Sequence, residues 1–446
     1  MTDTIIRGGA VVANGNVEIL DIAIRDGRIE RVGHHLGVAA QVIDATGLVV
    51  LPGLVDAHVH LRDPGFTHKE DFHSGTRAAA ASGVTTVVAQ PNTNPAVTTV
   101  DAFNEMRQIG AARAIVDFGI SAAATEDNIQ ELAGLVRAGA LSIDFALGGS
   151  APALTVRSNA KLVEILQTVA SLGTLATVYT ADADIGNAQR EDMIAAGRRD
   201  ALAFADAFPA VTEALGAARL LAAAIPTGAR VHIRQVSCPE TLQVAAAFRP
   251  LLQPNQLTIE VTPHHLYLTR DVIAEQGALA IMGPPLRRAA DTAALREALR
   301  VGSIDMVCTD HAPHTIPEKE AGRDDVWKTA PGTPGLETFL PSLLAAVDRG
   351  EMSLPDLARI ASERPAEIFG LAGRKGAIRA GLDADLVLVD PDCPHPVEPS
   401  RFHSKAHYSP FSGELRGKLH RTIVRGTTVY DGAFRVAPGF GRFLTP

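Results

Sequence analysis

Between residues 51 and about 370, the sequence repeats one order, in which a short apolar segment precedes a helical segment. A β-then-α order places successive strands parallel to one another, and eight such units predict an α/β protein with a closed (β/α)8 TIM-like barrel. An open doubly wound sheet is the alternative, but no Gly-x-Gly-x-x-Gly pattern follows a strand. The expected strands lie within 48–60, 85–89, 114–119, 141–145, 175–179, 230–234, 257–261 and 304–308.

The two ends of the chain have a different texture. Residues 1–50 and 375–446 contain short apolar segments separated by turn residues, which is typical of small β units. We therefore expect one small β-sandwich domain formed by both termini. The barrel would then occupy residues 51–374.

Charge and cysteine content exclude several classes of protein. The net charge is −9 with no basic cluster, which argues against a nucleic-acid partner or an anionic membrane surface. Three widely spaced cysteines form no Cys-x-x-Cys motif, so neither a disulfide framework nor a structural zinc knot is indicated. No basic segment followed by an apolar core opens the chain, and no uncharged run approaches the roughly 20 residues of a membrane span. We expect a soluble cytoplasmic protein.

Polar residues follow nearly every expected strand. The carboxyl ends of the strands carry the active site in barrels of this kind, so these residues predict a site there. His58 and His60 alternate along one strand and project to the same face, where two imidazoles can share a metal ion. By its spacing alone, a bare His-x-His is more often explained by ordinary hydrogen bonding. The polar strand-end residues are His58, His60, Gln90, Asn92, Asp144, Thr180, Gln235, Thr262, His264, His265, Asp310, His311 and His314.

Several motifs at these positions resemble one family over essentially the full length. They are residues 56–65 with 69–71, 83–95, 260–266, and 283–287 leading to 309–314. The chain resembles the amidohydrolase superfamily, and within it the cyclic amidohydrolases dihydroorotase, allantoinase and hydantoinase. The four stretches are most similar to dihydroorotase, an enzyme of pyrimidine biosynthesis.

The resemblance implies roles for individual residues. His58 and His60 match a pair of metal ligands, and Asp310 matches a metal-bound aspartate that acts as general base and acid. Arg62, Asn92 and His314 match the groups that bind the carboxylate of dihydroorotate. Their chemistry suits that task, because arginine offers a planar fork of donors and the other two offer single donors.

The family pattern is broken at four positions. Asp144 stands where a carboxylated lysine usually bridges two metals, and it remains a candidate ligand. Thr180 and Gln235 replace the two histidines of the second metal, and neutral threonine and glutamine are poor ligands for transition metals. Gly283 replaces a usual asparagine. We therefore expect one zinc ion per chain rather than two, with another divalent transition metal as a possible substitute.

Three functional hypotheses follow. The first is a metal-dependent dihydroorotase acting on a small substrate that carries a carboxylate. The second is a catalytically silent homologue that serves as a structural partner of aspartate transcarbamoylase. The third is a hydrolase of another cyclic amide or imide, as in hydantoinase or allantoinase. The retained His58, His60 and Asp310 favour an enzyme, and the retained Arg62 favours a carboxylate substrate. We also expect a homo-oligomer.

Overall fold

The computed structural model describes residues 2–149 and 152–446, and a parallel barrel lies at its centre. Strands that are neighbours in the chain are neighbours in the sheet, and a parallel bridge between Val59 and His311 joins the first strand to the segment after the last. The predicted (β/α)8 barrel is confirmed. Its strands are β6 (Leu54–Val59), β7 (Val84–Ala89), β8 (Asp117–Ala123), β9 (Ser142–Ala146), β10 (Leu175–Tyr179), β11 (Arg230–Ile233), β12 (Leu257–Val261) and β13 (Met306–Val307).

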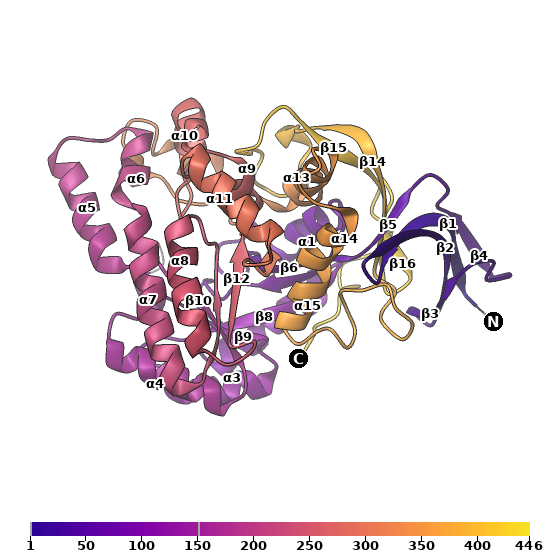
Figure 1. Ribbon diagram of the computed structural model, residues 1–446, viewed down its shortest axis with the longest axis horizontal. Helices are drawn as coiled ribbons and strands as arrows, with labels where there is room; N and C mark the ends of the chain where they lie inside the picture. The colour runs from indigo at the N-terminus through magenta and orange to yellow at the C-terminus, as the bar shows by residue number, and fades with distance from the viewer. Residues whose placement is uncertain (1, 150–151) are drawn as a thin grey trace.

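Helices surround the barrel, with α4, α7, α8 and α11 clearly visible on its outside (Figure 1). Several begin at a side-chain cap, as at Thr99 and Ser158, which satisfies backbone N–H groups that the first turn leaves free. The helices are α1 (Phe72–Ala80), α2 (Val100–Arg113), α3 (Leu132–Ala138), α4 (Asn159–Ser171), α5 (Ala183–Ala195), α6 (Ala201–Ala207), α7 (Ala210–Thr227), α8 (Pro239–Phe248), α9 (Pro263–Tyr267), α10 (Arg270–Gln276), α11 (Ala289–Arg300), α12 (Ile316–Glu320), α13 (Leu336–Asp348), α14 (Leu354–Ala358) and α15 (Arg364–Ile368).

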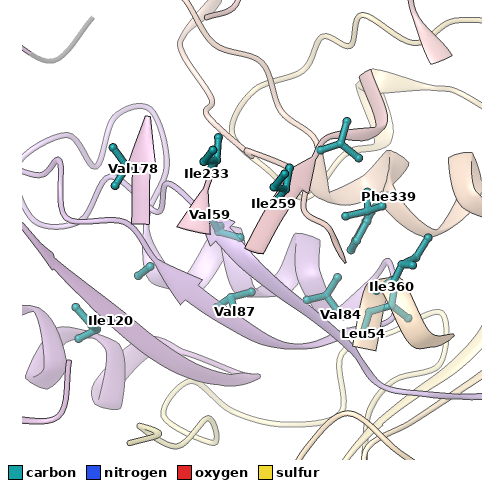
Figure 2. Close-up of a cluster of buried hydrophobic side chains, with 14 of the residues drawn as sticks. Leu54, Val59, Val84, Val87, Ile120, Val178, Ile233, Ile259, Phe339 and Ile360 are labelled. Carbon is teal, nitrogen blue, oxygen red and sulfur yellow. The ribbon is translucent and has the colours of Figure 1, made fainter. Parts of the chain in front are cut away.

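The largest apolar core fills the space between strands and helices. Val178, Ile233 and Ile259 pair in register across β10, β11 and β12, and all three belong to this core (Figure 2). Burying each such side chain stabilises the fold by roughly 1.5–3 kcal/mol. Because side chains alternate along a strand, Arg234 and Glu260, which follow two of these residues, point into the barrel.

Both termini contribute to a second, mixed sheet that lies at one end of the long axis (Figure 1). Its centre is β5, which pairs parallel with β1 and antiparallel with β14. The expected unit built from both ends is therefore present, as one hydrogen-bonded sheet; the boundaries at 50 and 375 stay a prediction. The strands are β1 (Thr4–Ala13), β2 (Asn16–Arg25), β3 (Arg28–Gly33), β4 (Gln41–Asp44), β5 (Val49–Pro52), β14 (Leu386–Pro396), β15 (Glu414–Val424) and β16 (Thr427–Tyr430).

One helical stretch within the described residues, Ala201–Thr227, is long and apolar enough to cross a membrane. It covers α6 and α7, and charged residues such as Glu213 and Arg219 interrupt its apolar run. Core helices of soluble proteins meet the same criterion, and α7 packs against α4 and α8. A single stretch of this kind is weak evidence for a membrane span.

Candidate functional site

Three potential ligand atoms converge at the carboxyl end of the barrel. His58 lies in β6, His60 follows that strand, and Asp310 follows β13. The Oδ1 atom of Asp310 lies 3.2 Å from His58 Nε2 and 3.0 Å from His60 Nε2. A tetrahedral metal with bonds of about 2.0–2.1 Å separates its ligands by roughly 3.3 Å. The spacing of the three atoms therefore fits one metal ion.

The contacts of Nδ1 in His58 and His60 show which ring nitrogen of each histidine is left to bind a metal. His58 Nδ1 lies 2.5 Å from Glu260 Oε1, and His60 Nδ1 lies 2.6 Å from Asn92 Oδ1. Since these oxygens accept hydrogen bonds, each Nδ1 donates, and each ring in its neutral form keeps a lone pair on Nε2. On His58 this lone pair also faces Arg234 Nη1 at 3.1 Å. Two such lone pairs facing a carboxylate at about 3 Å repel it unless a cation lies between them. The donor set therefore fits a divalent transition metal, with Glu260 and Asn92 orienting its ligands.

Burial and neighbouring charges keep this cluster electron-rich. Burial lowers the pKa of His60 to about 4, so its ring is neutral near pH 7. Burial alone would raise the pKa of Asp310, but the positive charge that His58 can carry and the adjacent His60 ring outweigh it and hold that pKa low. For His58, burial lowers the pKa, while the carboxylates of Glu260 and Asp310 outweigh burial and raise it. Asp310 is thus an anion.

Three site residues adopt the left-handed backbone region that non-glycine residues seldom occupy. The φ angles are +60° at Arg62, +46° at Gln235 and +46° at Asp310. Each residue lies two or three positions beyond the end of its strand. Conformations of this kind cost energy and cluster at functional sites. The surrounding structure therefore holds these three side chains in place at some cost in stability.

The predicted carboxylate-binding residues lie at one side of the cluster. Buried Arg62 donates from Nε to the Pro313 carbonyl at 3.3 Å, and its Nη2 lies 3.3 Å from His314 Nε2. His314 accepts from Lys69 Nζ at Nδ1 (3.2 Å), and its Nε2 lies 3.1 Å from the Pro331 carbonyl. Arg62 and His314 are thus adjacent, while Asn92 uses its Oδ1 to orient His60. Their role toward a substrate stays a prediction.

The opposite side of the cluster is lined differently. Asp144 Oδ1 accepts from Thr177 Oγ1 at 2.9 Å and pairs with Arg234 Nη1 at 3.1 Å. Asp144 is outside the group of three residues whose ligand atoms converge, so its metal role also stays a prediction. Gln235 Nε2 donates to Asp310 Oδ2 at 2.5 Å and to the Gly283 carbonyl at 3.1 Å.

Three buried polar atoms on this side have no partner among the described residues: Thr180 Oγ1, Arg234 Nε and His264 Nε2. Burial lowers the pKa of His264 to about 4, and Asp310 and His58 are the charges that act on it, which places its ring near the cluster. Buried polar atoms without a protein partner usually bind water, an ion or a ligand. These three atoms are therefore available to a bound molecule.

Sequence reasoning missed two buried charged residues of the site. Glu260 lies at 2.5 Å from His58 Nδ1 and at 3.0 Å from His232 Nε2, which explains His232 as an orienting partner. Arg234 reaches His58, Gln90 and Asp144. Each is a charged residue within or directly after an apolar strand. Buried charges are rare unless they are paired, and that signal could have revealed both.

The sequence of the chain is similar to those of several known proteins. A sequence model of the Amidohydrolase family matches residues 49–429. The chain belongs to the amidohydrolase family. It is 41% identical to a dihydroorotase of Halobacterium salinarum over 424 residues, covering 95% of this chain and 96% of the relative. It is 36% identical to an allantoinase of Rubrobacter xylanophilus, covering 100% and 98%.

Among solved structures, an L-hydantoinase (dihydropyrimidinase) from Arthrobacter aurescens superposes with a TM-score of 0.97. It is 33% identical and covers 100% of both chains. All three relatives are named for action on cyclic amides, so this amidohydrolase is a hydrolase of cyclic amides, in a family that is generally metal-dependent. Because their substrates differ, the choice of substrate has to be argued from the site.

Proposed function

We propose that this amidohydrolase opens and closes the ring amide of dihydroorotate, interconverting it with N-carbamoyl-aspartate, and that it uses one zinc ion. The main support for this proposal is that His58, His60 and Asp310 converge beside the buried Arg62. The charge of Asp310 acts on Arg62, and the charge of Arg62 acts on His60, so the guanidinium lies close to the cluster. A metal centre next to a buried cation suits a cyclic amide that carries a carboxylate.

His58, His60 and Asp310 would hold the ion, which when bound would polarise the amide carbonyl and make water more acidic. Asp310 then serves as general base and acid. Its carboxylate accepts a proton from the attacking water and returns it to the ring nitrogen as the C–N bond breaks. Gln235 donates to Oδ2 of this carboxylate and so fixes its orientation during both transfers.

Arg62 would bind the substrate carboxylate, with Asn92 and His314 as further donors. Burial, together with the charges of Arg62 and Lys69, lowers the pKa of His314 to about 2, so the ring is neutral. Because Lys69 donates to Nδ1, the ring proton lies on Nε2, beside Arg62. Arg62 can thus donate directly to the anion, whereas the Nε2–H group of His314, which lies 3.1 Å from the Pro331 carbonyl, would have to turn from that carbonyl to reach it.

A hydantoinase or allantoinase activity is the second candidate, supported by the TM-score of 0.97 to the L-hydantoinase. Hydantoin and allantoin bring no carboxylate, so Arg62 would stay buried without an anionic ligand. An unpaired buried charge is costly. Arg62 therefore favours dihydroorotate.

The test is steady-state hydrolysis of dihydroorotate, hydantoin and allantoin by the purified chain, with elemental metal analysis of the same sample. We expect about one zinc ion per chain and the highest kcat/KM on dihydroorotate. Absence of metal, with no activity after zinc or manganese is added, would contradict the proposal. Co-purification with aspartate transcarbamoylase would then support the silent-partner alternative.

We further propose that the protein acts in the cytoplasm as a homo-oligomer. Cell fractionation tests the first statement, and light scattering of the purified chain tests the second. A monomer at micromolar concentration would contradict the oligomer.

A further inference from the structure

We propose that the guanidinium of Arg234 replaces a second metal ion as the fixed cation of this site, with Asp144 as its anchor. The inference rests on the proposed one-metal hydrolase and deepens it. It gives Asp144 a role other than the ligand role expected from the sequence.

Arg234 lies next to the proposed metal ligands. The residue follows β11, and its side chain crosses the barrel interior to groups from three other strands. Its Nη1 lies 3.1 Å from Asp144 Oδ1, 3.0 Å from Gln90 Oε1 and 3.1 Å from His58 Nε2. Arg234 is 8% exposed. An arginine side chain stays charged under all physiological conditions, so a permanent cation lies next to the ligand cluster.

Asp144 already has hydrogen-bonding and charged partners. Its Oδ1 atom is already engaged by Arg234 and by Thr177 Oγ1. A metal ion on this carboxylate would need an oxygen at about 2.0–2.2 Å. It would then lie within a few ångströms of the guanidinium, and two cations so close in a buried site repel strongly. A metal on His58 would meet the same guanidinium, but there three ligand atoms converge to hold it, whereas Asp144 belongs to no such group.

Beyond Asp144, the described residues on this side offer a second metal one imidazole nitrogen, His264 Nε2, which belongs to no group of three converging ligand atoms. Gln235 turns its amide N–H group to Asp310 and the Gly283 carbonyl, so it donates where a metal ligand would offer a lone pair. Thr180 offers only a neutral hydroxyl. The residues present therefore do not fit a second divalent ion, and they do fit one guanidinium.

The experiment restores imidazoles while Arg234 is kept or removed. Thr180→His and Gln235→His are combined in one chain, and the same pair is combined with Arg234→Met in another. Zinc per chain is measured by elemental analysis after dialysis against a zinc buffer. We expect the double variant to keep the wild-type count and the triple variant to gain about one further equivalent, because removal of the guanidinium frees Asp144.

Arg234→Lys in the same double background is the matched control. It keeps the positive charge, so its zinc count should stay at the wild-type value. The inference is overturned if the double variant gains zinc on its own. It is also overturned if the lysine triple variant gains zinc, or if a folded methionine triple variant gains none.

A single substitution gives a second test that needs no restored histidines. Arg234→Met should bind zinc at least about 10-fold more tightly than the wild type, because a positive charge near His58 Nε2 is lost. Competition with a chromophoric chelator measures the affinity, and an unchanged or weaker affinity would overturn the inference. Circular dichroism confirms folding. Wild-type protein that is inactive with all three substrates would contradict only the proposed function, because the zinc comparison is made between variants.

Discussion

The two sides of the barrel mouth use the same scaffold in opposite ways. On the side of β6 and β13, His58 and His60 present lone pairs to Asp310. On the side of β9 to β11, Arg234 and Gln235 present N–H donors to neighbouring acceptors. Both sides place polar groups at strand ends, as parallel barrels do. The comparison teaches that the fold supplies the positions, whereas donor or acceptor character decides how many cations those positions hold.

The largest effect is expected from Asp310→Asn, which removes the carboxylate proposed to serve both as metal ligand and as general base. We expect kcat on dihydroorotate to fall about 10³-fold or more, with loss of most bound zinc. Asp305→Asn is the control, because Asp305 lies just before β13 and accepts from Ile259 N, away from the cluster. A variant at Asp310 that keeps a tenth of the wild-type rate and its metal would remove the contrast between the two sides.

Arg62→Ala should rank next. We expect kcat/KM on dihydroorotate to fall about 10²-fold, because a buried charged partner of the carboxylate is lost, while zinc content is unchanged. Steady-state kinetics on dihydroorotate and hydantoin, with metal analysis, measures this. Arg62→Lys should recover part of the loss. An equal loss on hydantoin would show that Arg62 acts on the site as a whole and not on the carboxylate.

Glu260→Gln tests whether the carboxylate of Glu260 orients the proposed metal ligand His58. The substitution weakens the acceptor that orients His58, and zinc affinity should fall about 10- to 100-fold. Glu213→Gln is the control, because this equally buried carboxylate bonds Ser237 and contacts no proposed ligand. Competition titration with a chelator measures both. If the two variants lose affinity alike, the effect of Glu260 is not specific to His58.

The smallest effect is expected in the pH dependence of folding stability, through the buried carboxylate of Glu337. Burial raises the pKa of Glu337 from 4.5 to about 7. Glu337 accepts from the backbone N–H groups of His403 and Ser404, and Ser404 Oγ bonds Glu70, the partner of His311. Between about pH 4.5 and pH 7, the folded state therefore binds more protons than the unfolded chain at this group.

The contribution of Glu337 to stability is thus present below about pH 4.5 and is lost as the pH rises to about 7. Glu337→Gln should flatten this part of the pH profile, so that its stability relative to the wild type rises between pH 5 and pH 7.5. Urea unfolding at both pH values measures the change. Parallel profiles for the two proteins would contradict the assignment.

Sequence patterns located most elements but missed their limits in places. The expected strand at 114–119 lies at Asp117–Ala123, because residues 114–116 are also apolar and buried but belong to the connection after α2. Helix α5 leaves little trace in the sequence, because Gly186 is its one buried residue and its apolar period is weak. The strand expected at 304–308 is reduced to Met306–Val307.

The sequence alone determined the β-then-α order, the common face of His58 and His60, and, through family resemblance, Asp310. The first two features follow from local periodicity, which decides where each side chain points along its own strand. Only the tertiary structure decided the partners of Arg234 and Glu260, whose side chains bond groups 25 to 202 residues away in the sequence. Buried charges are neutralised through space, so their partners depend on which strands the closed barrel brings together.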